Sequence, residues 1–322
     1  MYRNIMVPVD GSAFSREAVL QGLRIASKCG ATLRLVRVET ATVPLAVPQT
    51  VAIVNQDHLS ERNAVLADLY SIAVECRAHS TVTVTASLEK GPVADALIGY
   101  AKRHSVDLIV IRSHARKGLA RLWFGSVADD LIRKSGIPVM VVRQPSLATA
   151  LESGFQLKRI LVPLDGSSLA EESLRAAATT ARCDGASLTL LRVVAPYTHN
   201  NHDDDLESDI GPASAMEVDE ARHYLASLFT SSTDRFAGVS RRVIISDDVA
   251  GTILRVAESE ETDLIAIATR GRGSIVRAAA GSVADQVMRG SAVSTLIVHP
   301  LPESAERSGY RLAARELAAT GT

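Results

Sequence analysis

Two short acidic turns are the clearest candidates for binding chemistry in this 322-residue chain. Asp10-Gly11-Ser12 follows one apolar run, and Asp165-Gly166-Ser167 follows a closely similar one. A carboxylate at the end of a strand can accept hydrogen bonds from a ribose or an adenine, or face a metal that rides on phosphates. The alternative is structural, because Asp and Ser also turn the chain and cap the helix that follows. For either turn alone, both interpretations stay open.

A glycine-rich basic segment in the second half is the other candidate for chemistry. Residues 268–274 read Ala-Thr-Arg-Gly-Arg-Gly-Ser, and Gly281-Ser282 precede a helical pattern. Glycine lets the backbone approach phosphate oxygens, and a helix N-terminus offers free N–H groups and a positive dipole end. Positive charge comes from Arg270, Arg272 and Arg277. The segment predicts a polyphosphate site, and the alternative is a solvated basic loop.

The elements that must position these residues occur twice. Residues 5–12 recur as residues 160–167 with six of eight positions identical, and residues 125–129 recur unchanged as 281–285. Matches at a nearly constant offset over more than a hundred residues indicate a duplication. We therefore expect two copies of one fold in a single polypeptide.

Each copy alternates strand and helix patterns. Short apolar runs rich in β-branched residues predict strands near 3–9, 32–38, 82–88, 107–112 and 138–143. Apolar stripes predict helices through Phe14, Ala18, Gly22 and Ile25, through Leu59, Leu66, Tyr70, Ala73 and Val74, and through Leu174, Ala177, Ala178 and Ala181. Residues 168–171 fit a capping box that opens the last of these helices. Five alternations per copy predict an α/β fold with a doubly wound parallel sheet in each half.

Breaks in the pattern divide the chain into a first domain at 1–145, a second at 157–300 and a tail at 301–322. A polar stretch, 198–212, contains two histidines and several aspartates. We expect a solvated loop there, with a metal site as the alternative, because no rigid ligand spacing is present. The tail has the pattern of a short amphipathic helix.

The combination of motifs resembles the universal stress protein family. Both halves show a strand ending in V-P-x-D-G-S, a later D-L-I strand, and nine residues leading to Gly-Ser. The resemblance covers about 3–143 and 158–299, and it implies a five-stranded Rossmann-like sheet in each half. Members that bind ATP carry G-x-x-G-x9-G-[S/T], and an Asp after the first strand and backbone at the end of the second strand lie near the nucleotide. Those positions correspond to Asp10, Asp165, Val38 and Val193.

Both copies depart from the family's glycine motif. In the second half, Ala268 replaces the first glycine, and Gly271, Gly281 and Ser282 follow the motif. In the first half, Arg112 and Ala115 replace the first two glycines before an intact Gly125-Ser126. Arg112 either blocks the pocket or pairs with phosphate as a planar donor. We therefore expect the second half to be the stronger binder.

Composition excludes several other classes of function. A net charge of −1 gives no general reason for binding nucleic acid or membrane surfaces. No apolar stretch reaches membrane-spanning length, and no signal peptide is recognisable, so we expect a cytoplasmic protein. Three scattered cysteines suit a reducing compartment, where each is expected to be a small buried apolar residue. His114 and His299 lack a visible catalytic partner, and Trp123 is expected to serve packing or surface contact.

The hypothesis that follows is a cytoplasmic stress-response protein that senses adenine nucleotide, with ATP bound mainly in the second half and Mg²⁺ as a companion on the phosphates. The resemblance also implies that the two halves form an internal pseudo-dimer through 139–143 and 295–299, and that two chains associate further. We expect no dedicated metal site and no catalytic residues. The main alternative is a tandem scaffold that has lost nucleotide binding, and weak ATP hydrolysis ranks third.

Overall fold

The computed structural model describes residues 1–39, 51–112, 125–143, 156–198, 210–211, 215–228, 237–269 and 283–299. Gly271, Gly281, Ser282, His114, Ala115 and Trp123 lie outside these residues, as do the tail and most of the polar stretch 198–212. No helix among the described residues is long and apolar enough to cross a membrane.

In the first half, the described residues form nine elements in which strands and helices alternate strictly. They are β1 (Asn4–Pro8), α1 (Ala13–Cys29), β2 (Thr32–Glu39), α2 (Val51–Ala78), β3 (Val84–Lys90), α3 (Val93–Arg103), β4 (Leu108–Arg112), α4 (Ser126–Lys134) and β5 (Val139–Val142). Each of the five predicted strands is present within two residues of its expected bounds.

The second half repeats this order with one addition. Its elements are β6 (Arg159–Pro163), α6 (Ser168–Asp184), β7 (Ser187–Val194), β8 (Tyr197–Thr198), β9 (Ile210–Gly211), α7 (Ala215–Ser227), β10 (Val239–Ile245), α8 (Val249–Ser259), β11 (Leu264–Ala268), α9 (Val283–Gly290) and β12 (Ser294–Val298). The added β8 and β9 lie near the two ends of the polar stretch 198–212, and they pair with each other in antiparallel fashion.

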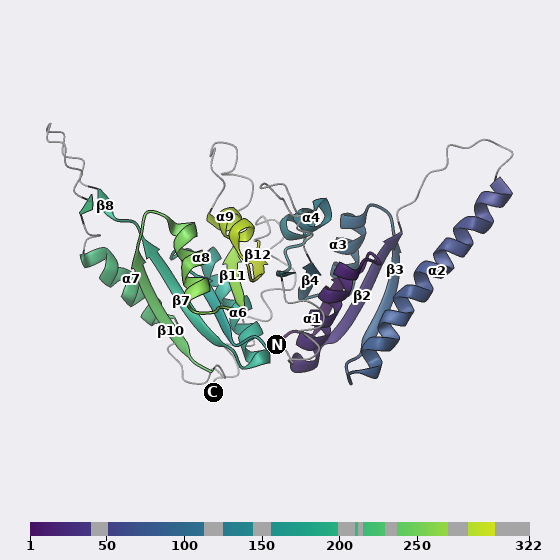
Figure 1. Ribbon diagram of the computed structural model, residues 1–322, viewed down its shortest axis with the longest axis horizontal. Helices are drawn as coiled ribbons and strands as arrows, with labels where there is room; N and C mark the ends of the chain where they lie inside the picture. The colour runs from purple at the N-terminus through teal and green to yellow at the C-terminus, as the bar shows by residue number, and fades with distance from the viewer. Residues whose placement is uncertain are drawn as a thin grey trace.

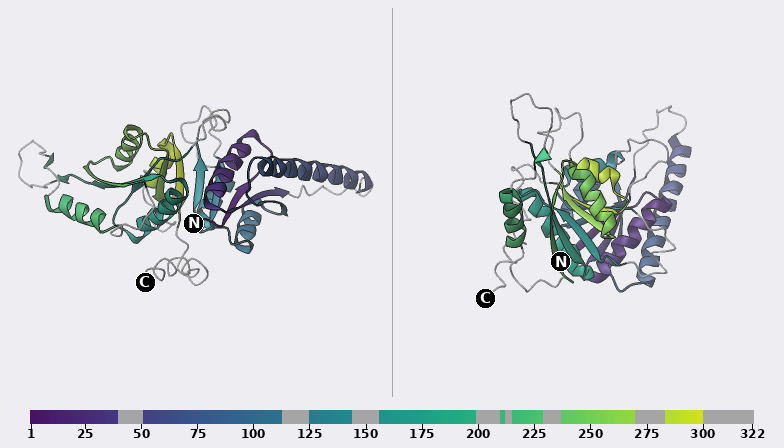
Figure 2. Two further views of the ribbon diagram at one scale, coloured as in Figure 1. Left: turned by 90° about the horizontal axis from the view of Figure 1, so that it is seen from below. Right: turned by 60° about the vertical axis from the view of Figure 1, so that its left-hand side comes forward.

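The two five-stranded sheets join into one ten-stranded sheet (Figure 1). Its order is β10-β7-β6-β11-β12-β5-β4-β1-β2-β3, and all pairs are parallel except the central pair of β12 with β5. Thr295 lies opposite Val141 in that pair. The predicted pairing of the last strands is thus present, and the tandem Rossmann-like fold is confirmed. Figure 2 shows the halves arranged along the long axis, with α2 and α7 towards opposite ends.

Helices cover both faces of the sheet. On one face, α1, α2, α6 and α7 pack over a core that continues across the junction between the halves. On the other face, α3 with α4 and α8 with α9 cover separate cores. The strand β4 is a continuous apolar run because both of its faces are buried. Leu108 and Val110 face the first core, and Ile109 and Ile111 face the second.

Helix caps explain how α1 and α6 begin and end. The hydroxyl oxygens of Ser12 and Ser167 accept hydrogen bonds from the first turn of α1 and α6, and Gly30 and Gly185 end the helices in the left-handed region at φ 70°. The predicted capping box at 168–171 is wrong by one residue. The N-cap is Ser167, because the preceding acidic turn already orients its hydroxyl group.

Two predicted helix faces need correction. Among the residues of α2 whose burial is described, Leu69, Ile72, Ala73 and Cys76 are buried, whereas Tyr70 is 52% exposed and Val74 60% exposed; the predicted Leu59 lies outside that set. This helix covers only the outer strands of the sheet, so it buries a narrow stripe beside the predicted one. In α1, Phe14 is exposed at 45% while Ala18 and Ile25 are buried, and the predicted stripe of α6 is buried throughout.

The expectation that each cysteine is a small buried apolar residue is wrong for Cys29, which is partly buried, and it did not include a disulfide. Cys29 and Cys183 form a disulfide with their Cα atoms 5.1 Å apart, and Cys76 is a free buried residue. The linked residues lie at the C-terminal ends of α1 and α6, which contact each other at the junction. Their separation of 154 residues places them together only once the halves have docked, so no local spacing signals the bond.

Candidate functional site

The predicted site residues of each half gather at the carboxyl ends of three adjacent strands. In the first half, Asp10 follows β1, Val38 lies near the end of β2 and Arg112 ends β4. In the sheet, β1 is the middle strand of these three. In the second half, Asp165, Val193 and Ala268 have the same places on β6, β7 and β11. A ligand crevice in an open parallel sheet lies where the strand order reverses, and that point falls between β1 and β4 and between β6 and β11.

Each acidic turn is held by its own carboxylate. Asp10 Oδ1 accepts hydrogen bonds from the backbone N–H of Ser12 at 2.9 Å and from its hydroxyl at 2.6 Å. Asp165 Oδ1 does the same with Ser167, at 2.9 and 2.5 Å. Burial opposes ionisation of Asp10, but the hydrogen bonds from Ser12 hold its pKa below the usual value. The geometry is therefore that of the structural alternative: Asp fixes the Ser that caps the helix.

Glycine is required between Asp and Ser in both turns. Gly11 has φ +84° and Gly166 has φ +83°, a region that other residues adopt at a cost. In the first half, a Cβ on Gly11 would lie 3.0 Å from the Arg37 guanidinium. The turns therefore let a basic side chain from the second strand pack against the acidic turn.

An ion pair crosses the crevice of the first half. The Arg112 guanidinium at the end of β4 pairs with the Glu17 carboxylate of α1, and it lies 5.5 Å from the centre of the Phe14 ring. Both charged side chains are mostly buried, at 17% and 18% exposure, and burial lowers the pKa of Arg112. Of the two roles expected for Arg112, this contact favours the blocking role, because the guanidinium already has an anionic partner within the protein.

No counterpart of this ion pair occurs among the residues of the second half that the structure describes. Ala268 stands where Arg112 stands in the first half, because each is the last residue of the equivalent strand. Glu172, which has the same place in α6 as Glu17 in α1, is exposed. Among the described residues of the second half, no side-chain pair of this kind crosses the space between β6 and β11.

The phosphate motif is described only in the first half. Gly125 is the N-cap residue of α4 and Ser126 is its first residue, and no side chain caps this helix. A Cβ added at Gly125 would have no described residue within 4 Å, so none of the described side chains covers this helix N-terminus. The corresponding Gly281, Ser282 and Gly271 lie outside the described residues.

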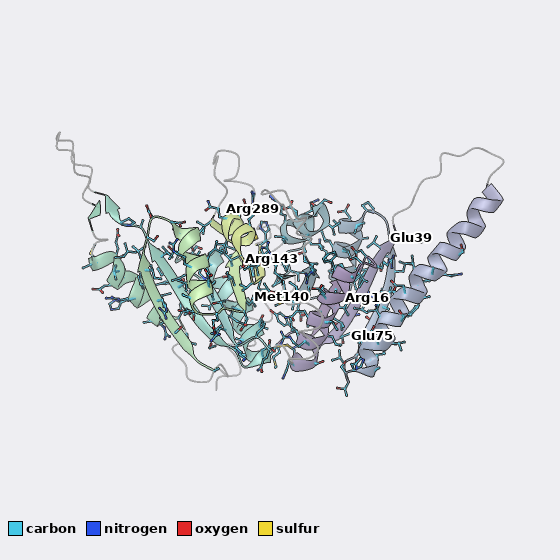
Figure 3. The ribbon with its side chains drawn as sticks, in the orientation of Figure 1. Arg16, Glu39, Glu75, Met140, Arg143 and Arg289 are labelled. Atoms are coloured by element: carbon cyan, nitrogen blue, oxygen red, sulfur yellow. A yellow bond between two sulfur atoms is a disulfide. The ribbon has the colours of Figure 1, made fainter. Side chains whose placement is uncertain are left out.

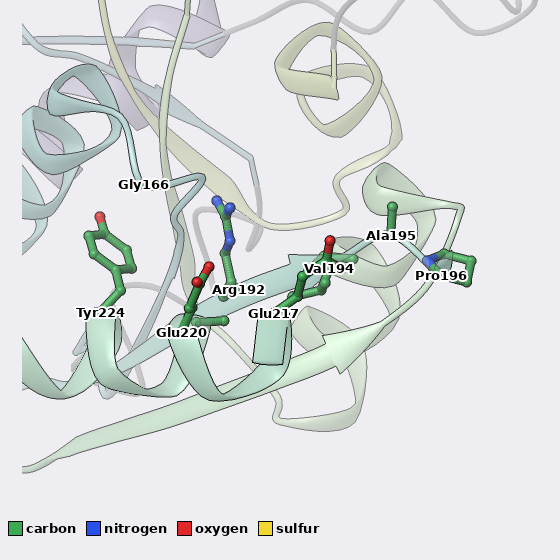
Figure 4. A pocket seen from close by; sticks show the side chains of 10 residues that line it. Gly166, Arg192, Val194, Ala195, Pro196, Glu217, Glu220 and Tyr224 are labelled. Atoms are coloured by element: carbon green, nitrogen blue, oxygen red, sulfur yellow. The ribbon is translucent and has the colours of Figure 1, made fainter. Parts of the chain in front are cut away.

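A cavity of about 700 Å³ opens beside the acidic turn of the second half. It is lined by Gly166, Arg192, Val193, Val194, Ala195, Pro196, Glu217, Glu220, Ala221 and Tyr224. Figure 4 shows Tyr224, Glu220 and Glu217 rising from one face of α7, and Arg192 reaching from β7 towards the turn with Gly166. Side chains of both charges therefore converge on a space next to Asp165. The predicted Val193 also lines this space.

Arg192 and its first-half equivalent Arg37 have different surroundings. Arg37 Nη1 donates to Asp68 Oδ2 of α2 at 3.0 Å, and the other carboxylate oxygen of Asp68 pairs with Arg16 at 3.3 Å. Arg192 Nη1 donates to the backbone oxygen of Leu164 at 3.3 Å and lines the cavity. Burial, followed by the nearby Glu171 carboxylate, raises the pKa of Tyr224 to about 12, so Tyr224 is a neutral hydrogen-bond donor at pH 7.

Sequence reasoning missed four polar residues of this cavity. They are Arg192, Glu217, Glu220 and Tyr224. The three residues of α7 follow one another at helical spacing on one face, which is a usable signal, but nothing in the sequence places that face beside β7. Arg192 is next to the predicted Val193, so the same strand end that predicts Val193 also indicates Arg192.

The junction between the halves lies close to the end of α9. Arg143, just after β5, donates hydrogen bonds to the backbone oxygens of Met288 at 2.6 Å and Ser291 at 2.5 Å. Figure 3 places Arg143 near the middle of the molecule, where the halves meet. The first half thus satisfies carbonyl groups at the C-terminal end of the helix that follows Gly281-Ser282.

His299, just after β12, has its Nδ1 2.9 Å from Thr269 Oγ1, and burial lowers the pKa of His299.

Metal ligands do not cluster among the residues that the structure describes, since no group of three His, Cys, Asp or Glu is placed to hold an ion. The His and Asp residues at 199–205 lie outside that part of the chain.

Both halves of the chain are similar to known proteins. The family model described as "Universal stress protein family" matches residues 1–143 and 156–299. A universal stress protein of Mycobacterium tuberculosis is 26% identical over 299 residues, which span 91% of this chain and 96% of that protein. The universal stress protein YxiE of Bacillus subtilis is 28% identical over 148 residues, covering 44% of this chain and 100% of that protein. The crystal structure of a universal stress protein from Archaeoglobus fulgidus shares the fold, with a TM-score of 0.63, 19% identity and coverage of 92% and 98%.

Proposed function

Because the chain belongs to the universal stress protein family, we propose that it is a stress-response sensor that binds adenine nucleotide mainly in its second half. The functional units are the two domains at 1–145 and 157–300, and the setting is the cytoplasm. ATP is the nucleotide that the family resemblance implies, with Mg²⁺ carried on its phosphates. Two chains associating further, as expected from the family, are part of the same proposal.

The observation that carries this proposal is the difference at one strand end. Arg112 and Glu17 occupy the first crevice with their own ion pair, whereas the second crevice has Ala268 at that position. A ligand entering the first half would have to displace a mostly buried ion pair, and separating such charges is costly. Ala268 imposes no such cost on a ligand in the second half.

The cavity in the second half suits the nucleoside part of the ligand. Carboxylates of Glu217 and Glu220 can accept hydrogen bonds from ribose hydroxyls or from the adenine amino group, and Tyr224 can donate one. The two carboxylates disfavour phosphate in the same place, because like charges repel at short range. We therefore assign the phosphates to the segment with Gly271, Gly281 and Ser282, where the sequence supplies glycines and arginines.

The scaffold hypothesis has support from the first half alone. The Arg112–Glu17 pair gives the guanidinium at the end of β4 a partner within the protein in place of a ligand, so the first half fits a role in protein contacts. We rank hydrolysis below both hypotheses, because we assign the acidic residues of the cavity to ligand contact and assign no partnered base to activate water.

Analysis of what the purified full-length chain carries tests the proposal. The protein is denatured, and released small molecules are identified by mass spectrometry; fresh protein is then titrated with ATP in the presence of Mg²⁺. We expect an adenine nucleotide or saturable ATP binding. If neither is observed, the sensor proposal fails and the scaffold hypothesis stands.

A matched pair of variants tests the placement of the phosphates. Gly281→Val puts a side chain where phosphate is expected and should weaken ATP binding at least about tenfold, or about 1.4 kcal/mol. Gly125→Val makes the same change in the first half, where no described residue lies within 4 Å of the added Cβ, and should leave the affinity unchanged. Full binding by Gly281→Val would show that the phosphates lie elsewhere.

A further inference from the structure

The disulfide lies at the contact between the two halves, far from the acidic turns. Cys29 is the last residue of α1, and Cys183 lies next to the last residue of α6. These two helices contact each other across the junction, so the bond covalently links the first half to the second.

Noncovalent contacts hold the same junction. Arg24 of α1 forms an ion pair with Asp184 of α6, and the Tyr2 hydroxyl lies 2.9 Å from the Thr180 hydroxyl. The antiparallel pairing of β5 with β12 adds backbone hydrogen bonds on the same boundary. The two sulfur atoms would therefore stay close together after the bond opens, and the thiols could form the bond again without refolding.

The two sulfur-bearing residues differ in access from solvent. Cys183 is buried at 8% exposure, whereas Cys29 is only partly buried, beside the exposed Lys28 and Gly30. Thiol–disulfide exchange requires an incoming thiolate to reach one sulfur atom along the bond, so the rate depends on access. Cys29 is therefore the residue of the pair that is more open to an external thiolate.

We propose that Cys29 is a thiol-exchange site through which the covalent link between the halves responds to low-molecular-weight thiols such as glutathione. The thiolate of the small molecule attacks Cys29 Sγ, the bond to Cys183 Sγ breaks, and Cys183 leaves as a thiolate that takes up a proton. A second small thiol attacks the sulfur of the small molecule in the mixed disulfide and releases Cys29. The balance is one protein disulfide and two small thiols giving two protein thiols and one small-molecule disulfide.

The third cysteine provides an internal control. Cys76 is 4% exposed in the core under α2, and burial raises the pKa of its thiol to about 11. A buried neutral thiol exchanges slowly, because the thiolate is the reactive species. Modification of Cys76 would thus report unfolding instead of exchange at the junction.

The test uses the full-length chain in buffers with increasing ratios of reduced to oxidised glutathione. Free thiols are blocked briefly with N-ethylmaleimide, and each cysteine is quantified by peptide mass spectrometry. We expect Cys29 and Cys183 to become thiols together while Cys76 stays unmodified, and the trapped mixed disulfide to carry glutathione on Cys29. A bond that excess reduced glutathione leaves intact in the folded chain, or glutathione trapped on Cys183, would overturn the proposal.

Two single variants measure the asymmetry directly. Cys183→Ser leaves Cys29 as the reacting thiol, and Cys29→Ser leaves Cys183. With oxidised glutathione, we expect the adduct on Cys29 to form about tenfold faster than the adduct on Cys183, since access limits the exchange. Equal rates, or a faster reaction at Cys183, would contradict the assignment, and circular dichroism checks that both variants are folded.

Discussion

The two halves of this chain share one fold but use the crevice between their first and fourth strands differently. In the first half, Arg112 reaches from β4 to Glu17 on α1 and fills the crevice with an internal ion pair. In the second half, Ala268 leaves that position small, and a cavity with Arg192, Glu217 and Glu220 opens nearby. A duplicated domain can thus keep its strands and caps while the two copies carry different side chains at the end of one strand.

The comparison also shows which features do not depend on ligand binding. The acidic turns, with Asp10 and Asp165 bonded to the capping Ser residues, are nearly identical in geometry in both halves. Their presence in a half whose crevice is crossed by an ion pair indicates that they serve the helix cap first. The difference between the halves therefore lies at the ends of β4 and β11.

The largest expected effect comes from removing the covalent link between the halves. Cys29→Ser should lower the free energy of unfolding by about 4 kcal/mol, because the bond constrains a long loop in the unfolded chain. Denaturant unfolding without reductant measures this, and the wild-type chain with reductant should reproduce it. Lys28→Ser, at the neighbouring exposed position, should change the free energy by less than about 0.5 kcal/mol. An unchanged midpoint in Cys29→Ser would show that the link has no role in stability.

Removing the charge that crosses the first crevice should have the next largest effect. Arg112→Ala leaves the mostly buried Glu17 carboxylate without its partner, so the free energy of unfolding should fall by about 2 kcal/mol. Chemical denaturation measures the change. Glu172→Ala is the matched control in the second half, where the exposed side chain predicts a change below about 0.5 kcal/mol. Equal effects of the two substitutions would remove the proposed difference between the crevices.

Transferring the blocking residue to the second half should weaken nucleotide binding. Ala268→Arg provides a guanidinium on β11 that Glu172 can bind, as Glu17 binds Arg112, and the affinity for ATP should fall at least about tenfold, or about 1.4 kcal/mol. Isothermal titration calorimetry measures the affinity. Arg112→Ala provides the control, because a change in the first crevice should leave affinity in the second unaltered. Unweakened binding by Ala268→Arg would mean that the ligand does not pass the end of β11.

The smallest expected effect concerns the acidic turn of the first half at low pH. Hydrogen bonds from Ser12 lower the pKa of Asp10 in the folded state despite burial, so its contribution to stability is present above the unfolded pKa and is lost as the pH falls through the folded pKa. The turn is exposed and screened by water, so the contribution should be below about 1 kcal/mol. The difference in the free energy of unfolding between wild type and Asp10→Asn should shrink from pH 7 to about pH 3. A constant difference over this range would contradict the argument.

The fold was predictable from the sequence because it depends on local patterns that repeat. The runs 5–12 and 160–167 identify equivalent strands, and apolar stripes identify α1 and α6. Faces of peripheral helices were less predictable: Tyr70 and Val74 fit a helical stripe, but only the position of α2 at the sheet edge decides that they are exposed.

The site was predictable only where a single strand end determines it. The placement of Asp165 and Val193 follows from the position of their strands. Arg112 could be recognised because it replaces a glycine of the family motif. Its partner Glu17 could not, because the pairing needs β4 beside α1. The contribution of α7 to the cavity and the bond between Cys29 and Cys183 depend in the same way on the packing of distant segments.

The number of adenine nucleotides bound per chain at saturation tests the central claim most directly. Equilibrium dialysis of the full-length wild-type chain with labelled ATP and Mg²⁺ measures this number without any substitution. We expect one nucleotide per chain, bound in the second half. Two equivalent sites per chain would contradict it, because the Arg112–Glu17 pair would then not close the first crevice.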